Sequence, residues 1–216
     1  MNAEKIVARD VTRFDARKKI FVADKKFVSV EKCFEIRVNG QPFKKIFCSP
    51  EDVEDLVAGL IAQAEKFSPA EKISCPEKIF VAKKILSGAD KLLGELSTTH
   101  DKTNGTHSGA LFDGEKILLV REDISRHNVF DKIFGAALHQ KIFLGDKVLI
   151  FSGRCSAEMI LKVARMNIPV VVAKSVPTTH AINLAKKFGV TLAGRLTADS
   201  FCIYTNPERI VLSKEG

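Results

Sequence analysis

The sequence contains no tryptophan and a single tyrosine, although it contains fifteen phenylalanines. Proteins that bind single-stranded nucleic acid usually present exposed aromatic rings on which the bases stack. An aromatic content made almost wholly of phenylalanine is typical instead of a hydrophobic core. We therefore do not expect nucleic acid as a partner, and we rank a basic RNA-binding module last among the functions considered.

The cysteines are odd in number and widely spaced, and no two of them form a C-x-x-C pair. Neither a zinc ribbon nor a redox-active dithiol is therefore indicated. The first residues lack the apolar segment of a secretory signal, and no apolar run is long enough to span a bilayer. These absences predict a cytoplasmic protein with reduced thiols and no membrane attachment. The five cysteines are Cys33, Cys48, Cys75, Cys155 and Cys202.

Common nucleotide and metal motifs are also missing. The chain has neither the G-x-G-x-x-G of a dinucleotide-binding Rossmann turn nor the G-x-x-x-x-G-K-[ST] of a P-loop. A zinc-dependent deaminase needs H-x-E together with P-C-x-x-C, but His107 is followed by Ser108 and Gly109. We therefore expect no metal site.

The composition is that of a globular chain with anionic partners. Hydrophobic residues make up 45% of the 216 residues, which is enough for one core and a small second subdomain. Lysine and arginine outnumber aspartate and glutamate by 34 to 26, which leaves a formal net charge of +8. This excess favours anionic partners such as phosphates, nucleotides or RNA, without choosing among them.

The N-terminal part predicts a hairpin and a helix. Residues 34–38 and 42–47 flank an Asn-Gly pair, which favours a two-residue β-turn. The Ser-Pro-Glu-Asp segment 49–52 is typical of a helix start, and the helix is predicted over 53–62. The middle of the chain predicts a strand over 71–75, helices over 77–87 and 88–97, an irregular polar segment over 98–109 and a second hairpin of 109–113 with 116–120.

The C-terminal third predicts alternating strands and helices. Its strands are continuously apolar and its helices are short crossovers, which is typical of a parallel sheet buried on both faces. The predicted strands are 147–151, 168–174 and 190–194, and the predicted helices are 157–167 and 180–189.

Turns that follow parallel strands lie along one edge of a sheet, where open α/β sheets bind ligands. The turns 152–154, 175–178 and 194–195 would share that carboxyl edge, and two of them lead into helix N-termini that suit an anion. Gly153 would allow close approach of a ligand, and Arg154 and Arg195 would supply phosphate donors. The alternative is that the Ser and Thr residues in these turns are ordinary helix N-caps.

Seven ionisable side chains lie within residues 121–135, directly after an apolar strand. Such a run is commonly a solvated helix start. Arg126 and His127 lie in this run, and His107 lies in another loop among small residues, so we predict that all three contact a ligand. His100, His139 and His180 have neither an adjacent arginine nor a surrounding run of small residues, and we expect surface or capping roles for them.

Six segments, in order along the chain, resemble the formate dehydrogenase accessory sulfur carrier family (FdhD/NarQ). They are V-N-G-Q-P-F with S-P-E-D-V-E-D-L-V-A-G-L-I, T-N-G-T-H-S-G-A-L-F-D, R-E-D-I-S-R-H-N-V-F-D-K-I-F-G, S-G-R-C-S-A-E-M-I-L-K, S-V-P-T-T-H-A-I-N-L-A and I-Y-T-N-P-E-R-I. The resemblance implies a cytidine-deaminase-like three-layer α/β/α core with a mostly parallel sheet over residues 71–216. Residues 1–70 would form a small α+β subdomain of hairpin and helix.

The resemblance also implies a function and its partners. Members of this family receive sulfur as a persulfide from a cysteine desulfurase. They deliver it to Mo-bis(molybdopterin guanine dinucleotide), a bound cargo that GDP or GMP could mimic, for the catalytic subunit of formate dehydrogenase. The family also suggests a homodimer. Its cofactor-binding segment corresponds to Arg195, Leu196, Thr197, Ala198, Asp199 and Ser200.

The chain departs from the family at its sulfur-carrying loop. Where the family has C-G-x-C-G, this sequence has I-S-C-P-E-K over residues 73–78, with Cys75 as its one thiol. The resemblance makes Cys75 the persulfide carrier, and a structural role at a strand end is the alternative. Because the second thiol is missing, a related function also stays open, in which the protein binds the cofactor or a guanine nucleotide without transferring sulfur.

Overall fold

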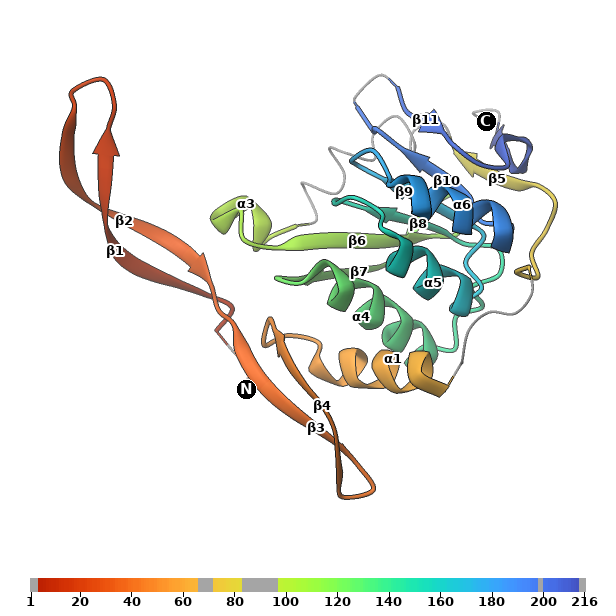
Figure 1. The fold of residues 1–216 in the computed structure, drawn as a ribbon, viewed down its shortest axis with the longest axis horizontal. Helices are drawn as coiled ribbons and strands as arrows, with labels where there is room; N and C mark the ends of the chain where they lie inside the picture. Colours follow the sequence, from red (N-terminus) through yellow and green to blue (C-terminus); the bar gives the residue numbers. More distant parts are fainter. Residues whose placement is uncertain (1–3, 66–71, 83–96, 198–199, 214–216) are drawn as a thin grey trace.

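The computed structural model describes residues 4–65, 72–82, 97–197 and 200–213. Its centre is a six-stranded sheet with the strand order β11-β10-β9-β8-β6-β7 (Figure 1). The strands are β6 (His107–Phe112), β7 (Ile117–Asp123), β8 (Val148–Phe151), β9 (Val170–Ala173), β10 (Thr191–Gly194) and β11 (Cys202–Ile203).

Four strands of this sheet run in one direction. β8, β9 and β10 pair parallel to one another, while β6 pairs antiparallel with both β7 and β8. β7, β8, β9 and β10 therefore share one direction, and β6 and β11 run the opposite way. The predicted α/β class with a mostly parallel sheet is confirmed.

Both faces of the sheet are buried, as the apolar runs predict. Leu149 and Phe151 of β8 pack into a core on the helical face, whereas Val148 and Ile150 pack into a core on the opposite face. This division follows from the alternation of side chains along a strand. The helices on the first face are α4 (Arg126–His139), α5 (Ala157–Arg165) and α6 (Thr179–Phe188) (Figure 1).

A parallel pair of strands contributes to the core on the second face. β5 (Ile79–Ala82) pairs with β12 (Ile210–Ser213), which follows the short 3₁₀ helix η1 (Pro207–Arg209). The helix predicted over 77–87 is therefore wrong for its described part, because Ile79 and Val81 alternate into the core as a strand requires. The strand predicted over 71–75 is also wrong, since residues 72–78 are irregular. Residues 83–96, which include most of the helix predicted over 88–97, lie outside the described part.

Helix α1 (Val53–Glu65) packs directly on α4, and two glycines allow the close approach. A Cβ on Gly59 would lie 1.9 Å from the carbonyl oxygen of Asp131, and one on Gly135 would lie 1.8 Å from that of Asp55. The two backbones therefore touch where the helices cross.

Two hairpins precede α1. The predicted hairpin is confirmed as β3 (Lys32–Val38) and β4 (Gln41–Cys48). A longer hairpin before it, β1 (Ile6–Asp15) with β2 (Ile20–Ser29), was not predicted, and it projects away from the helices and the central sheet (Figure 1). The division into subdomains 1–70 and 71–216 stays a prediction.

Candidate functional site

The loops that follow β7, β8, β9 and β10 lie at one edge of the sheet because these four strands share a direction. Backbone hydrogen bonds continue between the loops beyond the strand ends. Ser152 N–H donates to the Ser108 carbonyl oxygen at 2.9 Å, and Lys174 N–H donates to that of Phe151 at 2.9 Å. Leu196 N–H donates in turn to the Lys174 carbonyl oxygen at 2.9 Å. The predicted carboxyl edge is therefore one continuous surface.

A cavity of about 500 Å³ opens at this edge. Its volume lies within the range that binds small ligands and nucleotides. The cavity is lined by hydroxyl groups, two imidazoles and one ammonium group. These groups can form hydrogen bonds with an anionic or polar ligand. The lining residues are Ser97, His100, Asn104, Gly105, Thr106, His107, Ser108, Ser152, Lys174 and Ser175.

The two histidines of this edge cavity are held at the start of β6. Burial lowers the pKa of His107 below its ordinary value, and the neighbouring Arg126 and His100 side chains lower it further, which favours the neutral imidazole. His100 Nδ1 lies 2.6 Å from the Thr106 carbonyl oxygen, to which it donates. This bond fixes the orientation of the His100 ring. His100 is a cavity residue that our sequence interpretation missed.

Gly153 allows the loop after β8 to pass close to His107. A Cβ at position 153 would lie 2.7 Å from Cε1 of Phe151 and 3.3 Å from Nδ1 of His107. The Phe151 ring, whose centroid is 5.9 Å from that of His107, is fully buried and has little room to move. The close approach inferred from the sequence is therefore present, and a larger residue at position 153 would clash with Phe151 and press against His107.

The segment 195–200 continues from β10 along the same edge. Leu196 is buried in the core, so its side chain anchors the segment and does not line the edge cavity. Arg195 is exposed and adopts a left-handed backbone conformation with φ of 55°. Thr197 N–H donates to the Ser200 carbonyl oxygen at 2.8 Å, and Ser200 N–H donates to Thr197 Oγ1 at 3.0 Å, which closes a tight turn. Ala198 and Asp199 lie outside the described residues.

Arg126, His127 and Arg154 do not line the edge cavity. Arg126 and Arg154 are exposed, and Arg126 is close enough to His107 to affect its pKa. His127 lines a different cavity of about 370 Å³ formed by residues of α4, α5 and β4, where its Nε2 lies 3.5 Å from Glu158. Burial lowers the pKa of His127, and Lys162 lowers it further. The structure therefore separates His127 from His107.

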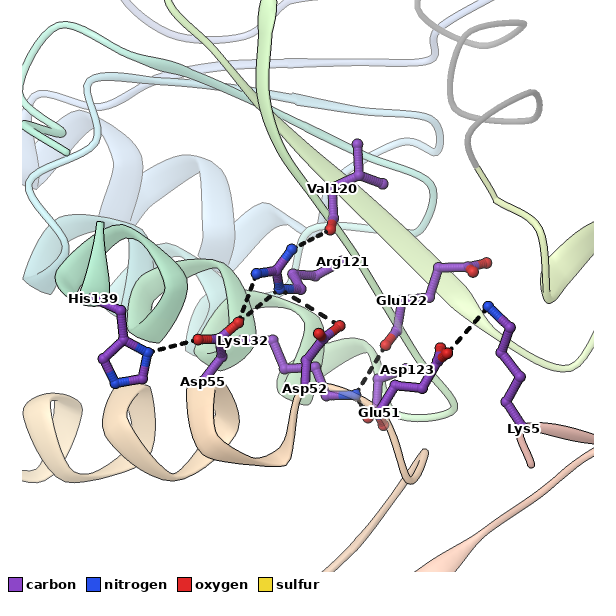
Figure 2. Close-up of polar contacts among 10 residues, drawn as sticks. All are labelled: Lys5, Glu51, Asp52, Asp55, Val120, Arg121, Glu122, Asp123, Lys132 and His139. Carbon is purple, nitrogen blue, oxygen red and sulfur yellow. Dashed lines mark hydrogen bonds and ion pairs between the residues drawn. The ribbon is translucent and has the colours of Figure 1, made fainter. Parts of the chain in front are cut away.

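The end of β7 contacts α1, α3 (His100–Thr103) and α4, and Figure 2 draws its contacts with α1 and α4. Arg121 donates from Nε and Nη2 to Asp55 of α1 at 2.9 and 2.7 Å, and Asp55 also pairs with His139 at 2.8 Å. Glu122 accepts from the backbone N–H groups of Thr99 and His100, both at 3.2 Å, at the start of α3. The segment 98–109, predicted to be irregular, therefore contains a short helix that Glu122 holds at the rim of the edge cavity.

Asp123 is the centre of a buried polar network. Asp123 and Lys132 are both fully buried, and Lys132 Nζ lies 2.7 Å from Asp123 Oδ2. Asp123 also accepts from Ser49 N–H at 3.1 Å, Ser125 N–H at 2.9 Å and Asn128 Nδ2 at 2.9 Å. These contacts tie the end of β4 to the start of α4. Much of the charge in residues 121–135 is thus structural, and the carboxylate of Asp123 is inaccessible to a ligand.

Cys75 lies at the opposite edge of the sheet. Ser74 N–H donates to Asn167 Oδ1 at 2.9 Å, and Ile73 N–H donates to the Phe188 carbonyl oxygen at 3.0 Å. Asn167 and Phe188 precede β9 and β10, so they mark the amino ends of those strands. β9 and β10 have four residues each, and a strand of that length spans about 13 Å. The amino and carboxyl edges of the sheet are therefore at least about that far apart. The structure does not bring Cys75 together with the other predicted site residues.

The five thiols differ in exposure. Cys75 is partly exposed, and Cys33 and Cys202 are exposed. Burial raises the pKa of Cys48 to about 11 and that of Cys155 to about 12, so both are unreactive thiols at neutral pH. Across the described ranges no three His, Cys, Asp or Glu side chains are grouped as a metal site would require. Within those ranges no helix is long and apolar enough to cross a membrane.

Comparison with known proteins first defines the class of fold. The crystal structure of a protein described as a formate dehydrogenase accessory protein, from Desulfotalea psychrophila, superposes with a TM-score of 0.84. The two chains are 21% identical, and the superposition covers 96% of this chain and 100% of that one. This chain therefore has the fold of that protein.

Sequence comparison then identifies the family. The Sulfur carrier protein FdhD of Geobacillus kaustophilus (strain HTA426) is 30% identical over 89% of this chain and 93% of its own length. That of Bacillus subtilis (strain 168) is 30% identical over 97% of this chain and 99% of its own. A model of the FdhD/NarQ family matches residues 64–211. The chain belongs to the FdhD/NarQ family, as the resemblance of its motifs implies.

Proposed function

We propose that this protein is a sulfur carrier that serves a formate dehydrogenase. The observation that carries the proposal is the similarity, over nearly the whole chain, to relatives named sulfur carrier protein FdhD. Cys75 would accept the sulfur, and the edge cavity with the segment 195–200 would hold a guanine-dinucleotide molybdenum cofactor as cargo. The cavity volume of about 500 Å³ suits one nucleotide portion of that cargo.

The sulfur-accepting step needs one thiolate. Cys75 Sγ would attack the terminal sulfur of a persulfide on a cysteine desulfurase. A new sulfur–sulfur bond forms on Cys75 while the bond in the donor breaks, and the donor cysteine leaves as a thiolate. The terminal sulfur keeps its oxidation state, so neither oxidant nor reductant is consumed. Partial exposure of Cys75 is compatible with this attack.

Cys75 and the edge cavity lie at opposite edges of the sheet. Transfer of sulfur from Cys75 to the cofactor therefore requires an arrangement that brings the two together. Either the segment 72–78 moves, or a second copy of the chain in a homodimer presents its own Cys75 edge. The exposed Arg195, Arg154 and Arg126 would then supply positive charge for the phosphates of the cargo. His107, whose neutral form is favoured, would offer a hydrogen bond within the edge cavity.

Intact-mass measurement tests the sulfur-carrying step. After incubation with a cysteine desulfurase and free cysteine, the wild type is expected to gain the mass of one sulfur atom, about 32 Da, since one thiolate takes one terminal sulfur. Cys75→Ala is expected to lose this adduct completely. Cys33→Ala and Cys202→Ala, which remove the two exposed thiols, serve as matched controls and should keep it.

An adduct that persists in Cys75→Ala would show that another thiol carries the sulfur. Absence of any adduct, together with retained GDP binding, would favour the second candidate, a cofactor- or guanine-nucleotide-binding protein without sulfur transfer. The specific observation behind that candidate is the edge cavity itself, which is formed without any contribution from Cys75.

Gly153→Ala is expected to weaken GDP binding about tenfold, a change of roughly 1.4 kcal/mol. The added Cβ would meet the fixed Phe151 ring and press against His107. Isothermal titration calorimetry measures this affinity directly. Gly145→Ala is the matched control, because its added Cβ would meet chiefly the exposed ring of Phe143, which can move aside. Equal affinities for the two variants would contradict binding at the edge cavity.

A further inference from the structure

The hairpin β1–β2, which we call the arm, exposes a set of large apolar side chains. Phe21 is 74% exposed, Phe27 57% and Phe14 52%, and Ile20 and Val28 are exposed as well. The rings of Phe14 and Phe21 pair with each other, 5.2 Å apart, near the tip. Figure 1 shows the arm extending into open space beside α3.

An isolated two-stranded ribbon is marginally stable in water, and its unpaired edges readily accept another strand. The arm pairs in regular register over ten residues of each strand. Its tip is fixed by Asp15, which accepts from the N–H groups of Arg17 and Lys18, both at 3.1 Å. A regular ribbon with exposed phenylalanines is therefore suited to be covered by a partner molecule.

The charge of the arm indicates the chemistry of that partner. Residues 6–29 contain seven basic and three acidic side chains, so the arm carries a net charge of +4, half of that of the chain. Two such arms would repel each other, which disfavours pairing of the arm with the arm of a second copy. Asp10, Asp15 and Asp24 pair with Lys25, Arg13 and Lys26 of the ribbon, which reduces the positive charge that the phosphates of a nucleic acid would meet. An acidic protein surface with apolar pockets is the best match.

The base of the arm is joined to the rim of the edge cavity. Ser29 Oγ lies 2.8 Å from Thr103 Oγ1 of α3, and a Cβ on Gly105 would come within 2.8 Å of the same Ser29 atom. Lys5, which immediately precedes β1, donates to Thr98 Oγ1 at 3.0 Å and pairs with Glu51 at 3.2 Å (Figure 2). A partner held by the arm would therefore face the edge cavity, whereas Cys75 lies at the far edge.

We propose that the arm docks the acceptor protein, the one that receives the cargo of the edge cavity, through an acidic surface of that acceptor. The sulfur donor binds elsewhere, at the edge that carries Cys75. This inference rests on the proposed function, which supplies the formate dehydrogenase catalytic subunit as the acceptor. It assigns the two partners to two separate surfaces of the chain.

The test measures the affinity of the full chain for two purified proteins by biolayer interferometry. One is the cofactor-free catalytic subunit of formate dehydrogenase, and the other is the cysteine desulfurase. Phe21→Ser removes the most exposed ring of the arm, and the double variant Arg17→Glu with Lys18→Glu reverses the charge of its tip. Phe143→Ser, at a similarly exposed ring (68%) outside the arm, is the matched control.

Both arm variants are expected to bind the catalytic subunit about tenfold or more weakly, as losses at interface anchors typically are. Their affinities for the desulfurase and for GDP should match those of the wild type, and Phe143→Ser should behave as the wild type with all three. Unchanged acceptor affinity in both arm variants would overturn the inference. So would an equal loss of desulfurase binding.

Three further outcomes also decide the question. If the wild type forms the Cys75 adduct and binds GDP but does not bind the catalytic subunit, the inference fails while the proposed function stands. If light scattering finds a dimer that Phe21→Ser converts into a monomer, the arm is a self-association element and the inference is wrong. Binding of single-stranded RNA that the tip variant abolishes would likewise overturn it.

Discussion

Lys132→Met is expected to lower the free energy of unfolding by about 3–5 kcal/mol, because it leaves the buried carboxylate of Asp123 without a counter-charge. Both side chains are fully buried, and their 2.7 Å contact lies beside the bonds from Asp123 to Ser49 and Asn128. Methionine fills a similar volume, so the loss comes from the charge and not from a cavity. Urea unfolding followed by circular dichroism measures the change.

The matched control is Arg37→Met. Arg37 pairs with Glu35 at 2.9 Å, but both side chains are about half exposed, and a surface ion pair contributes at most about 1 kcal/mol. Equal losses for the two variants would contradict the role assigned to Asp123. Because Asp123 joins β4, β7 and α4, Lys132→Met should also weaken GDP binding at the neighbouring edge cavity.

The part of the fold that could be predicted from sequence is the part encoded by local patterns. Strands β8, β9 and β10 are short, mainly apolar runs, and their predicted bounds agree with the structure within two residues. The arm carries no such signal. Its strands mix charged and apolar residues, and its four-residue turn, 16–19, has no Asn-Gly pair. The strand β5 was mistaken for a helix because four residues cannot distinguish the two periods.

The location of the candidate site followed from topology, but the composition of the site did not. Parallel strands place Gly153 and Arg195 at the carboxyl edge, whereas residues 196–200 follow from the family resemblance. The sequence pattern groups His127 with His107 in loops, but α4 begins at Arg126. Successive residues on a helix point about 100° apart, so Arg126 and His127 face different directions. His100 was missed because the glutamate that positions it, Glu122, is 22 residues away.

The roles of the charged residues in the run 121–135 also could not be predicted from the sequence. Arg121 and Asp123 point to one side of β7 and Glu122 to the other, as alternation along a strand requires. Each side chain therefore meets a different element: α1, α3 or β4. No local sequence pattern distinguishes a carboxylate that binds a ligand from one that caps a helix or neutralises a buried lysine. That distinction depends on which distant elements pack against the strand.

Gly135→Ala is expected to lower the free energy of unfolding by about 3 kcal/mol, at the upper end of the usual cost of overpacking. Alanine alone would favour the helix by about 1 kcal/mol, so a loss would come entirely from packing. The added Cβ would lie 1.8 Å from the Asp55 carbonyl oxygen, which is backbone and cannot rotate away. Helices α1 and α4 would have to separate, which would strain the contacts of Asp55 with Arg121 and His139.

A double-mutant cycle tests whether both glycines serve the same crossing. Gly59 meets the carbonyl oxygen of Asp131 as Gly135 meets that of Asp55, so one separation of the helices would relieve both contacts. The loss in Gly59→Ala with Gly135→Ala should therefore be smaller than the sum of the single losses. Additive losses would mean that the two contacts are independent, and a stabilised Gly135→Ala would contradict the close crossing. Denaturant midpoints of the four proteins decide among these outcomes.

Because α4 carries Arg126 and His127 at its first turn, the same separation would also displace these two side chains.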